Sequence, residues 1–215
     1  TRLVGGVIMT HGDNSGLILP PKIAPIQAII VPIIFDKSRS EVLEKVNQHI
    51  NSLSDKVRVE ADLRDEYTPG WKFNEWELKG VPIRIEVGPR DVKNEQVVIV
   101  RRDTREKTIV KEIELKDTIV KMLDDIQNNL FQRAKEFRDC HTYDVDDFST
   151  FESIMKEGRG FIRANWCGSN ECEKSIQDKT TATIRCIPLE EAEPTGKCVY
   201  CDEEGKYRVY FAKAY

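Results

Sequence analysis

The sequence lacks the long apolar run that a membrane-spanning helix needs. A span takes roughly 18 or more consecutive apolar residues, whereas the longest run here, residues 28–35, is interrupted by Pro32 and has the length of a strand. This excludes a transmembrane protein. No basic segment followed by an apolar one stands at the start, so a secretory leader is not visible. The first residue is Thr1 rather than Met, and we expect the sequence to be a piece of a longer chain.

An excess of charge of one sign is also absent, and cysteines are few. The 215 residues include 33 Lys+Arg and 37 Asp+Glu, which gives a net charge of −4. This near-neutral balance still allows a locally basic binding face. Six cysteines are too few for a disulfide scaffold. The apolar fraction of 40% is enough to bury a core, which excludes wholesale disorder, and the length allows one large domain or two modest ones.

Hydrophobic periodicity predicts an α/β domain in the first half. Residues 1–24, rich in glycine and proline, are interpreted as strand edges and turns cut from a larger sheet. Pro32 inside the first strand favours an edge strand or a bulge, and Ser38 with Glu41 would form a capping box at the first helix. The remaining pattern predicts strands at 27–35, 57–63, 81–87 and 96–101, and helices at 40–53 and 68–80.

A long helix at 117–139, with a continuous apolar stripe, is predicted to join this domain to a C-terminal module. The module is predicted to contain a short helix near 148–156 and strands near 161–166, 182–188 and 207–212.

Four cysteines in the last quarter of the chain have metal-ligand spacing. Cys167 and Cys172 form C-x4-C, and Cys198 and Cys201 form C-x2-C. Two close thiolate pairs match a tetrahedral zinc site, with two local disulfides or reduced thiols as the alternatives. A site closed by four thiolates leaves no open coordination position, so its role would be structural.

The other two cysteines carry a weaker signal. Cys186 lies in a predicted strand and is interpreted as a small buried apolar residue. Cys140 and His141 could be a ligand pair or a nucleophile with its base, but no third orienting group is suggested nearby. We therefore discard a thiol hydrolase.

Positive charge is concentrated in residues 79–107, which hold eight basic residues against five acidic ones. Such a segment can follow a phosphate backbone, although an ordinary solvated face is the alternative. Phe73 and Glu77 lie four residues apart on the preceding helix and share a face. This pair suits single-stranded RNA. The ring can stack on an unpaired base, and the carboxylate can accept hydrogen bonds from the amino or imino edge of that base. Trp76 is interpreted as a core residue. Burial in the core is also the default interpretation of Phe73 when it is considered alone.

Four blocks together resemble the prolyl-tRNA synthetases of the archaeal and eukaryote-like form. They are TRLVGGVIMTHGDNSGLILPPKIAPIQ at 1–27, GWKFNEWELKGVPIRIEVGPRD at 70–91, TTATIRCIP at 180–188 and FAKAY at 211–215. The resemblance implies three parts. Residues 1–25 would be the end of a class II catalytic domain. Residues 26–125 would be an α/β anticodon-binding domain, a mixed sheet flanked by helices, and residues 126–215 a smaller α+β zinc-binding-like domain.

The resemblance also implies roles for particular residues. Thr1 and Arg2 resemble the end of the third class II signature, and Arg2 would contact ATP. The C-terminal carboxylate of Tyr215 would approach the active site, and the cysteine quartet matches the zinc-ligand positions. The implied anticodon contacts are Phe73, Glu77, Arg84, Arg90 and Asp91, with Arg102 and Lys107 as further candidates.

The family condenses L-proline with ATP, accompanied by Mg, to prolyl-adenylate and transfers the prolyl group to tRNA(Pro). Its members are cytoplasmic homodimers, and this portion would bind the anticodon and support the catalytic domain. Nothing here resembles the first two class II signatures, so we expect this portion alone not to activate proline. The alternative is a stand-alone zinc-stabilised RNA- or protein-binding module without enzymatic activity, which would not need residues 1–21.

Overall fold

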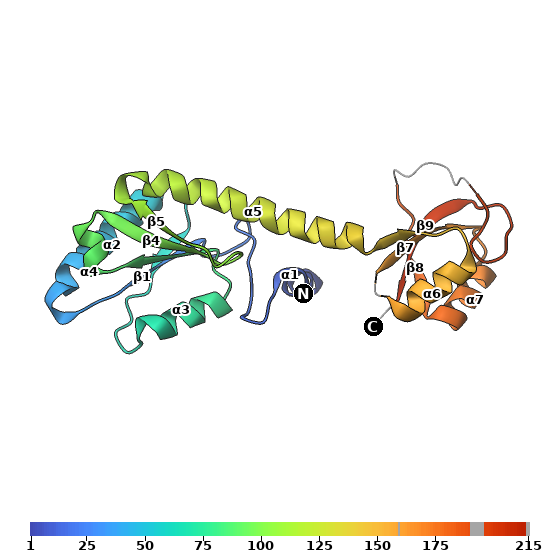
Figure 1. Ribbon diagram of the computed structural model, residues 1–215, viewed down its shortest axis with the longest axis horizontal. Helices are drawn as coiled ribbons and strands as arrows, with labels where there is room; N and C mark the ends of the chain where they lie inside the picture. Colours follow the sequence, from blue (N-terminus) through green and yellow to red (C-terminus); the bar gives the residue numbers. More distant parts are fainter. Residues whose placement is uncertain (159, 190–195, 214–215) are drawn as a thin grey trace. The chain divides into compact units, whose positions relative to one another are not determined.

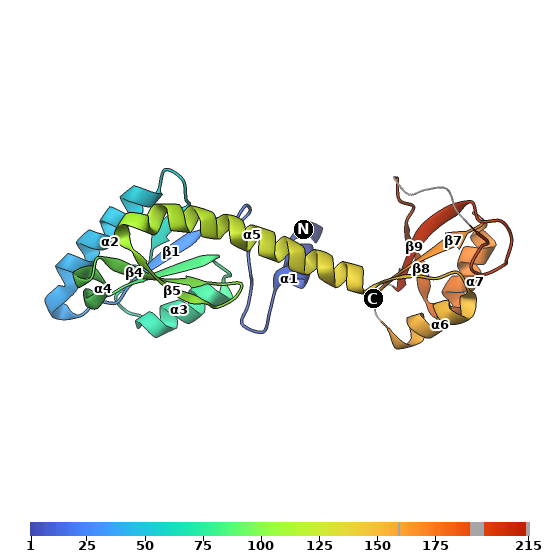
Figure 2. The same cartoon turned by 45° about the horizontal axis from the view of Figure 1, so that its top comes forward.

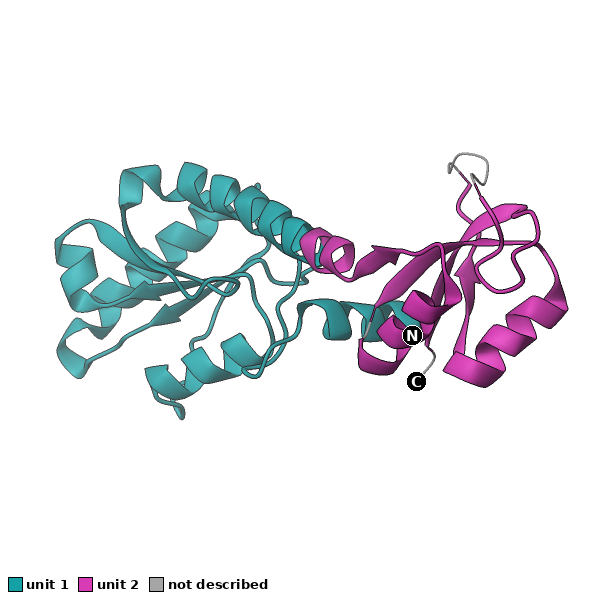
Figure 3. Cartoon of the chain, turned by 45° about the vertical axis from the view of Figure 1, so that its right-hand side comes forward, with its two compact units in different colours: residues 1–134 teal, residues 135–215 magenta. Residues whose placement is uncertain are grey.

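The computed structural model describes residues 1–158, 160–189 and 196–213 (Figure 1). The chain divides into two compact units, Thr1–Ala134 and Lys135–Tyr215 (Figure 3). The division falls inside one continuous helix, α5 (Leu115–Cys140), which the apolar stripe at 117–139 predicts. Within the described residues, no helix is long and apolar enough to cross a membrane.

The first unit is built on a five-stranded mixed sheet with the order β2-β1-β3-β4-β5. Strands β2, β1 and β3 run parallel, and β4 and β5 continue antiparallel from β3. The strands are β1 (Ala28–Pro32), β2 (Val59–Ala61), β3 (Ile83–Val87), β4 (Gln96–Arg101) and β5 (Lys107–Lys111). The mixed α/β domain is therefore confirmed, although β5 was not predicted.

Strand β1 is an internal strand, so the edge position favoured by Pro32 is wrong. β1 pairs with β2 on one side and β3 on the other. Pro32 lies at the end of β1, beyond the last residue paired with β2, and its register partner is Val87 of β3. Because β2 has already ended there, no second neighbour requires the missing N–H of proline.

Alternating side chains of the sheet divide the first unit into two layers. Ala28 and Ile30 of β1 belong to the main core. It is covered by α2 (Arg39–Leu53), α4 (Pro89–Lys93) and the first part of α5 (Figures 1 and 2). Ile29 and Val31 point to the other face, where they pack with Val81 and with α3 (Pro69–Leu78). This second layer is small, and polar side chains of β3 and β5 lie beside it.

The ends of the helices are partly as predicted. Thr68 caps α3 by accepting the N–H of Trp71 at 3.3 Å, and Gly80 follows the helix with a φ of +75°. The capping box at Ser38 and Glu41 is wrong. A short 3-10 helix, η1 (Asp36–Ser38), precedes α2, and the Ser38 hydroxyl donates to the carbonyl of Phe35 instead. A second one, η2 (Glu112–Glu114), leads into α5.

The start of the chain is helical, so the interpretation of residues 1–24 as strand edges is wrong. Helix α1 (Arg2–His11) has no buried residue and therefore no core-facing stripe by which its pattern could be recognised. The chain after it runs along the end of α3. There, the N–H of Leu17 donates to the carbonyl of Leu78 at 3.0 Å, and Leu19 donates to Gly80 at 3.0 Å.

The second unit has a four-stranded sheet with the order β6-β7-β9-β8. Its strands are β6 (Thr142–Asp144), β7 (Phe161–Trp166), β8 (Ala182–Cys186) and β9 (Tyr207–Lys213), and its helices are α6 (Phe148–Glu157) and α7 (Asn170–Thr180). Phe151, Met155 and Ile176 of the helices pack on Ile162 and Phe211 of the sheet. Helix α7 and strand β6 were not predicted.

The prediction that Cys186 is buried is wrong. The pairing of β8 with β9 shifts register between Ile184 and Cys186, and β8 is an edge strand. A bulge moves the following side chain away from the face that strict alternation assigns to it. Cys186 is therefore exposed. Cys140 is exposed as well, and Nδ1 of His141 lies 2.7 Å from the carbonyl oxygen of Phe137.

Candidate nucleic-acid interface and metal centre

A cleft lies on the α3 side of the sheet in the first unit. Its floor is apolar and its walls are charged, with a strong excess of basic groups. The lining residues are Ile29, Trp76, Glu77, Val81, Arg84, Val100, Arg101, Arg102, Arg105 and Lys107. The sheet register explains this grouping, because Ile29, Arg84, Val100 and Lys107 are successive cross-strand partners on β1, β3, β4 and β5.

Phe73 and Arg84 meet at one side of the cleft. The Arg84 guanidinium lies over the Phe73 ring, 4.2 Å from its centroid. Arg84 also donates from Nη2 to Oε1 of Glu86 at 2.9 Å, and Lys107 approaches the same oxygen at 3.6 Å. Phe73 is half-buried against the small second core, so the ring is held rigidly and supports a planar cation.

Glu77 lies at the other side of the cleft, among arginines. Nε of Arg105 approaches Oε1 of Glu77 at 3.5 Å. Arg102 is buried: it donates to the carbonyl of Glu77 at 2.9 Å and pairs with Asp13 through two bonds of 2.6 and 2.9 Å. The bonds from Arg102 hold the pKa of Asp13 well below its usual range. Nothing in the sequence pattern pointed to Asp13.

A buried polar group fixes α3 against the sheet. The side chain of Asp62 accepts from Nε1 of Trp76 at 2.8 Å and from Arg64, and Lys72 donates to its backbone carbonyl. Burial opposes ionisation of Asp62, but the bonds from Arg64 and Trp76 outweigh it and lower its pKa. Trp76 packs against the small core, as predicted. These contacts hold the helix that carries Phe73 and Glu77.

Arg90 and Asp91 do not line the cleft. Both lie on α4, which follows the C-terminal end of β3, whereas Arg105 lies in the turn beside the N-terminal end. Asp91 accepts the N–H of Gly88 at 3.0 Å and so stabilises the start of α4. Arg90 is exposed. Their contact with RNA stays a prediction.

The predicted ATP contacts lie at the start of α1. Thr1 is the N-cap of this helix and Arg2 its first residue, and both are exposed. Their role stays a prediction. Tyr215 lies outside the described residues.

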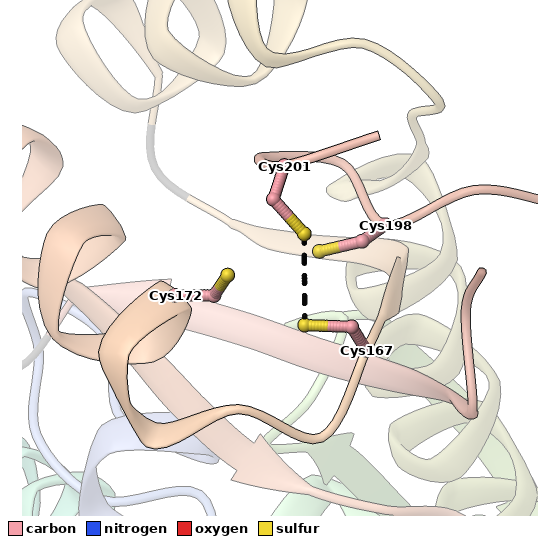
Figure 4. A group of neighbouring side chains, drawn as sticks. All are labelled: Cys167, Cys172, Cys198 and Cys201. Atoms are coloured by element: carbon pink, nitrogen blue, oxygen red, sulfur yellow. Dashed lines mark hydrogen bonds between the residues drawn. The ribbon is translucent and has the colours of Figure 1, made fainter. Parts of the chain in front are cut away.

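The four predicted zinc ligands converge in the second unit (Figure 4). The Sγ atoms of Cys167, Cys172, Cys198 and Cys201 all lie within 4.8 Å of one another, and those of Cys167 and Cys201 are 3.7 Å apart. Zinc–sulfur bonds of about 2.3 Å in a tetrahedron separate the sulfurs by roughly 3.8 Å. The cluster therefore fits a structural zinc ion.

Each cysteine pair is placed by a tight local structure. Cys167 directly follows β7, and Cys172 lies in the first turn of α7, with Gly168 at a φ of +86° between them. Cys198 and Cys201 lie in a turn in which the N–H of Cys198 donates to Glu203 at 2.7 Å. Burial opposes ionisation of Cys198, but neighbouring backbone N–H groups outweigh it and lower its pKa. Burial raises the pKa of Cys172, so the four thiols do not share a lowered pKa, and the fit to a metal rests on the sulfur distances.

Comparison with known proteins adds independent evidence. Residues 27–122 match the family model of the anticodon binding domain, and residues 148–215 match that of the prolyl-tRNA synthetase C-terminal domain. A proline–tRNA ligase of Alkaliphilus oremlandii is 51% identical over 215 residues, covering 100% of this chain and 44% of that protein. One from Natranaerobius thermophilus is 49% identical over 217 residues, covering 100% of this chain and 45% of that protein. The chain thus spans less than half the length of these curated relatives.

These matches agree with the fold of each unit. The first unit contains an anticodon-binding domain, whose charged cleft lies beside α3. The chain belongs to the prolyl-tRNA synthetases and corresponds to the C-terminal part of such an enzyme. This favours an enzymatic parent over a stand-alone binding module.

Proposed function

We propose that this chain binds the anticodon loop of tRNA(Pro) through the cleft beside α3, as part of a proline–tRNA ligase. The observation that carries the proposal is the pairing of a carboxylate with guanidinium groups across one apolar floor. Proline codons begin with two cytosines, so every proline anticodon contains two guanines. The Watson–Crick edge of guanine presents two donors to a carboxylate, and arginine pairs well with its other edge.

Glu77 and Arg84 take complementary parts in this proposal. Glu77 accepts from the imino and amino groups of a guanine. Arg84 lies over Phe73, 4.2 Å from the ring centroid, so an unpaired base stacks on the outer face of its guanidinium while the ring supports the inner face. Lys107, exposed on β5, meets a phosphate. Arg90 on α4 contacts the RNA backbone next to these bases, because a loop of several nucleotides is long enough to extend from the cleft to α4.

Fluorescence anisotropy with an RNA hairpin carrying the proline anticodon tests this proposal. Binding should weaken as salt rises, because phosphate contacts release counterions. Replacing a guanine by inosine removes its amino group and should weaken binding by about 1–3 kcal/mol. Equal affinity for hairpins with unrelated anticodons would refute the proposal.

Variants test which residue of the cleft recognises the guanine. Glu77→Gln should abolish the preference for guanine over inosine. Glu41→Gln, the same chemical change at an exposed position of α2, should keep it, and so should Lys93→Ala at an exposed position of α4. A Glu77→Gln variant that still distinguishes the two hairpins would show that Glu77 does not recognise the guanine.

The remaining expectations concern the whole enzyme. The four-cysteine cluster holds a structural zinc ion, and elemental analysis should find one per chain. Arg2 contacts ATP, which is bound with Mg and L-proline mainly by residues outside this sequence. This portion should therefore show no proline-dependent pyrophosphate exchange, and exchange by the purified chain would contradict this assignment. The family resemblance further implies that the whole enzyme is a cytoplasmic homodimer.

A further inference from the structure

The turn at residues 13–16 lies against the end of α3, beside the cleft. It closes through a bond from the N–H of Asp13 to the carbonyl of Gly16 at 2.9 Å, and the Asp13 carboxylate accepts the N–H of Ser15 at 2.8 Å. Gly16 has a φ of +126°, and a Cβ atom there would lie 2.5 Å from the carbonyl oxygen of Leu78. Only glycine allows so close an approach. The turn is therefore fixed to the helix that carries Glu77.

Arg102 connects this turn to the backbone of Glu77. Its side chain is only 3% exposed and bonds to one acceptor on each segment, the Asp13 carboxylate and the Glu77 carbonyl. The carbonyl belongs to the last turn of α3, and it also accepts the N–H of Gly80 at 3.0 Å. Arg102 thus fixes the backbone position of Glu77.

Arg105 contacts the side chain of Glu77 itself. Its guanidinium bonds to the Ser15 hydroxyl at 2.6 Å and approaches Asp13 at 3.4 Å and Glu77 at 3.5 Å. The backbone of Arg105 has a φ of +61°, a conformation that side-chain-bearing residues adopt uncommonly and that glycine adopts freely. An arginine in a glycine-like position indicates a requirement for its side chain.

We propose that Asp13, Arg102 and Arg105 are positioning residues for anticodon reading, which orient Glu77 and couple the segment after α1 to the cleft. The inference rests on the proposed function of Glu77. Arg102 holds the Glu77 backbone in place through its carbonyl, and Arg105 orients the Glu77 carboxylate at the wall of the cleft. Because coupling is reciprocal, a base bound to Glu77 stabilises the 13–16 turn, and the turn stabilises the bound base.

A double-mutant cycle separates this role from a purely structural ion pair. The measured quantity is the preference of the whole chain for the guanine hairpin over the inosine hairpin. Asp13→Asn should lower it at least about fivefold. The Asp13→Asn/Glu77→Gln double variant should bind the guanine hairpin as tightly as Glu77→Gln alone, so that the two losses of affinity do not add, because Asp13 acts through Glu77. Additive losses would overturn the proposal.

Asp55→Asn is the matched control. Asp55 pairs with Lys116 at 2.7 Å in the same unit, and neither residue lines the cleft. Its preference should equal that of the unsubstituted chain. If Glu77→Gln itself keeps the preference, the proposed function fails. If Glu77→Gln loses it and Asp13→Asn retains it, only the positioning proposal fails.

The Arg105→Gly variant separates a loss of base recognition from a loss of folding. Glycine suits the local φ, so the unfolding midpoint should stay the same or rise. The preference for guanine should nevertheless fall at least about fivefold, as for Asp13→Asn. A variant that is equally stable and equally selective would overturn the role of Arg105.

Discussion

The two units of this chain stabilise themselves in different ways. The first has a large aliphatic core, in which Ile30, Ile83, Ile85 and Ile99 are fully buried between the sheet and three helices. The second is smaller, and its core combines Phe151 and Phe211 with the four-cysteine cluster. Small domains bury a lower fraction of their surface and often need a metal. The larger unit can therefore leave one sheet face to a polar cleft, whereas we expect the smaller one to depend on its four-cysteine cluster.

The largest expected effect comes from breaking the cysteine cluster. Cys198→Ser removes a buried ligand and should destabilise the second unit by ~4 kcal/mol or more, with loss of zinc. Amide hydrogen exchange should rise in β7 and β9 and remain unchanged in β1 and β3. Cys186→Ser, on the exposed edge strand, is the control. Normal protection of β7 in the Cys198 variant would show that this unit does not need the cluster.

The converse change tests whether the first unit depends on its aliphatic core. Ile85→Ala should lower its free energy of unfolding by about 2–5 kcal/mol, because it leaves a cavity in a packed interior. Zinc content and exchange in the second unit should not change. Ile187→Ala, at a position 48% exposed, should have little effect. Loss of zinc in the Ile85 variant would mean that the units unfold together.

The comparison predicts that RNA binding belongs to the first unit alone. Phe73→Leu keeps an apolar side chain but removes the ring under Arg84. It should weaken binding of the proline anticodon hairpin by about 1–3 kcal/mol. Chelation of zinc should leave the same affinity nearly unchanged in anisotropy measurements. An equal loss in both experiments would place part of the RNA site in the second unit.

The smallest effect concerns pH and the first unit. Burial lowers the pKa of His49 below its usual 6.5, with Glu112 opposing and Lys45 reinforcing the shift. The folded state then binds fewer protons than the unfolded state, so stability is complete above pH 6.5 and decreases as the pH falls through the pKa of folded His49. Hydrogen exchange in β1 should report this decrease. His49→Gln should reduce it, and an unchanged slope would refute the assignment.

The sequence predicted best what periodicity or spacing encodes. The clean alternation of Ile83, Ile85 and Val87 predicted β3, and the two cysteine pairs predicted a cluster that converges in space. Helix α7 was missed because its sequence is mostly charged and buries only Cys172, Ile176 and Thr180. Helix α1 was missed because it buries nothing.

The sequence also did not predict the long-range polar contacts. Asp13 and Arg102 are 89 residues apart, and no local pattern links them. Arg102 was expected to face RNA, but its side chain is 3% exposed and points to Asp13. Burial of a charged group depends on tertiary packing that propensity does not describe. The positive φ of Arg105 is likewise visible only in the folded chain.

The close approach of residues 16–19 to the end of α3 bears on how this unit should be excised for study. The family match begins at residue 27. A fragment cut there would lose the N–H donors that satisfy Leu78 and Gly80, and would leave the buried guanidinium of Arg102 without its carboxylate. An isolated RNA-binding fragment should therefore start at or before Gly12, even though the added residues form no strand of the sheet.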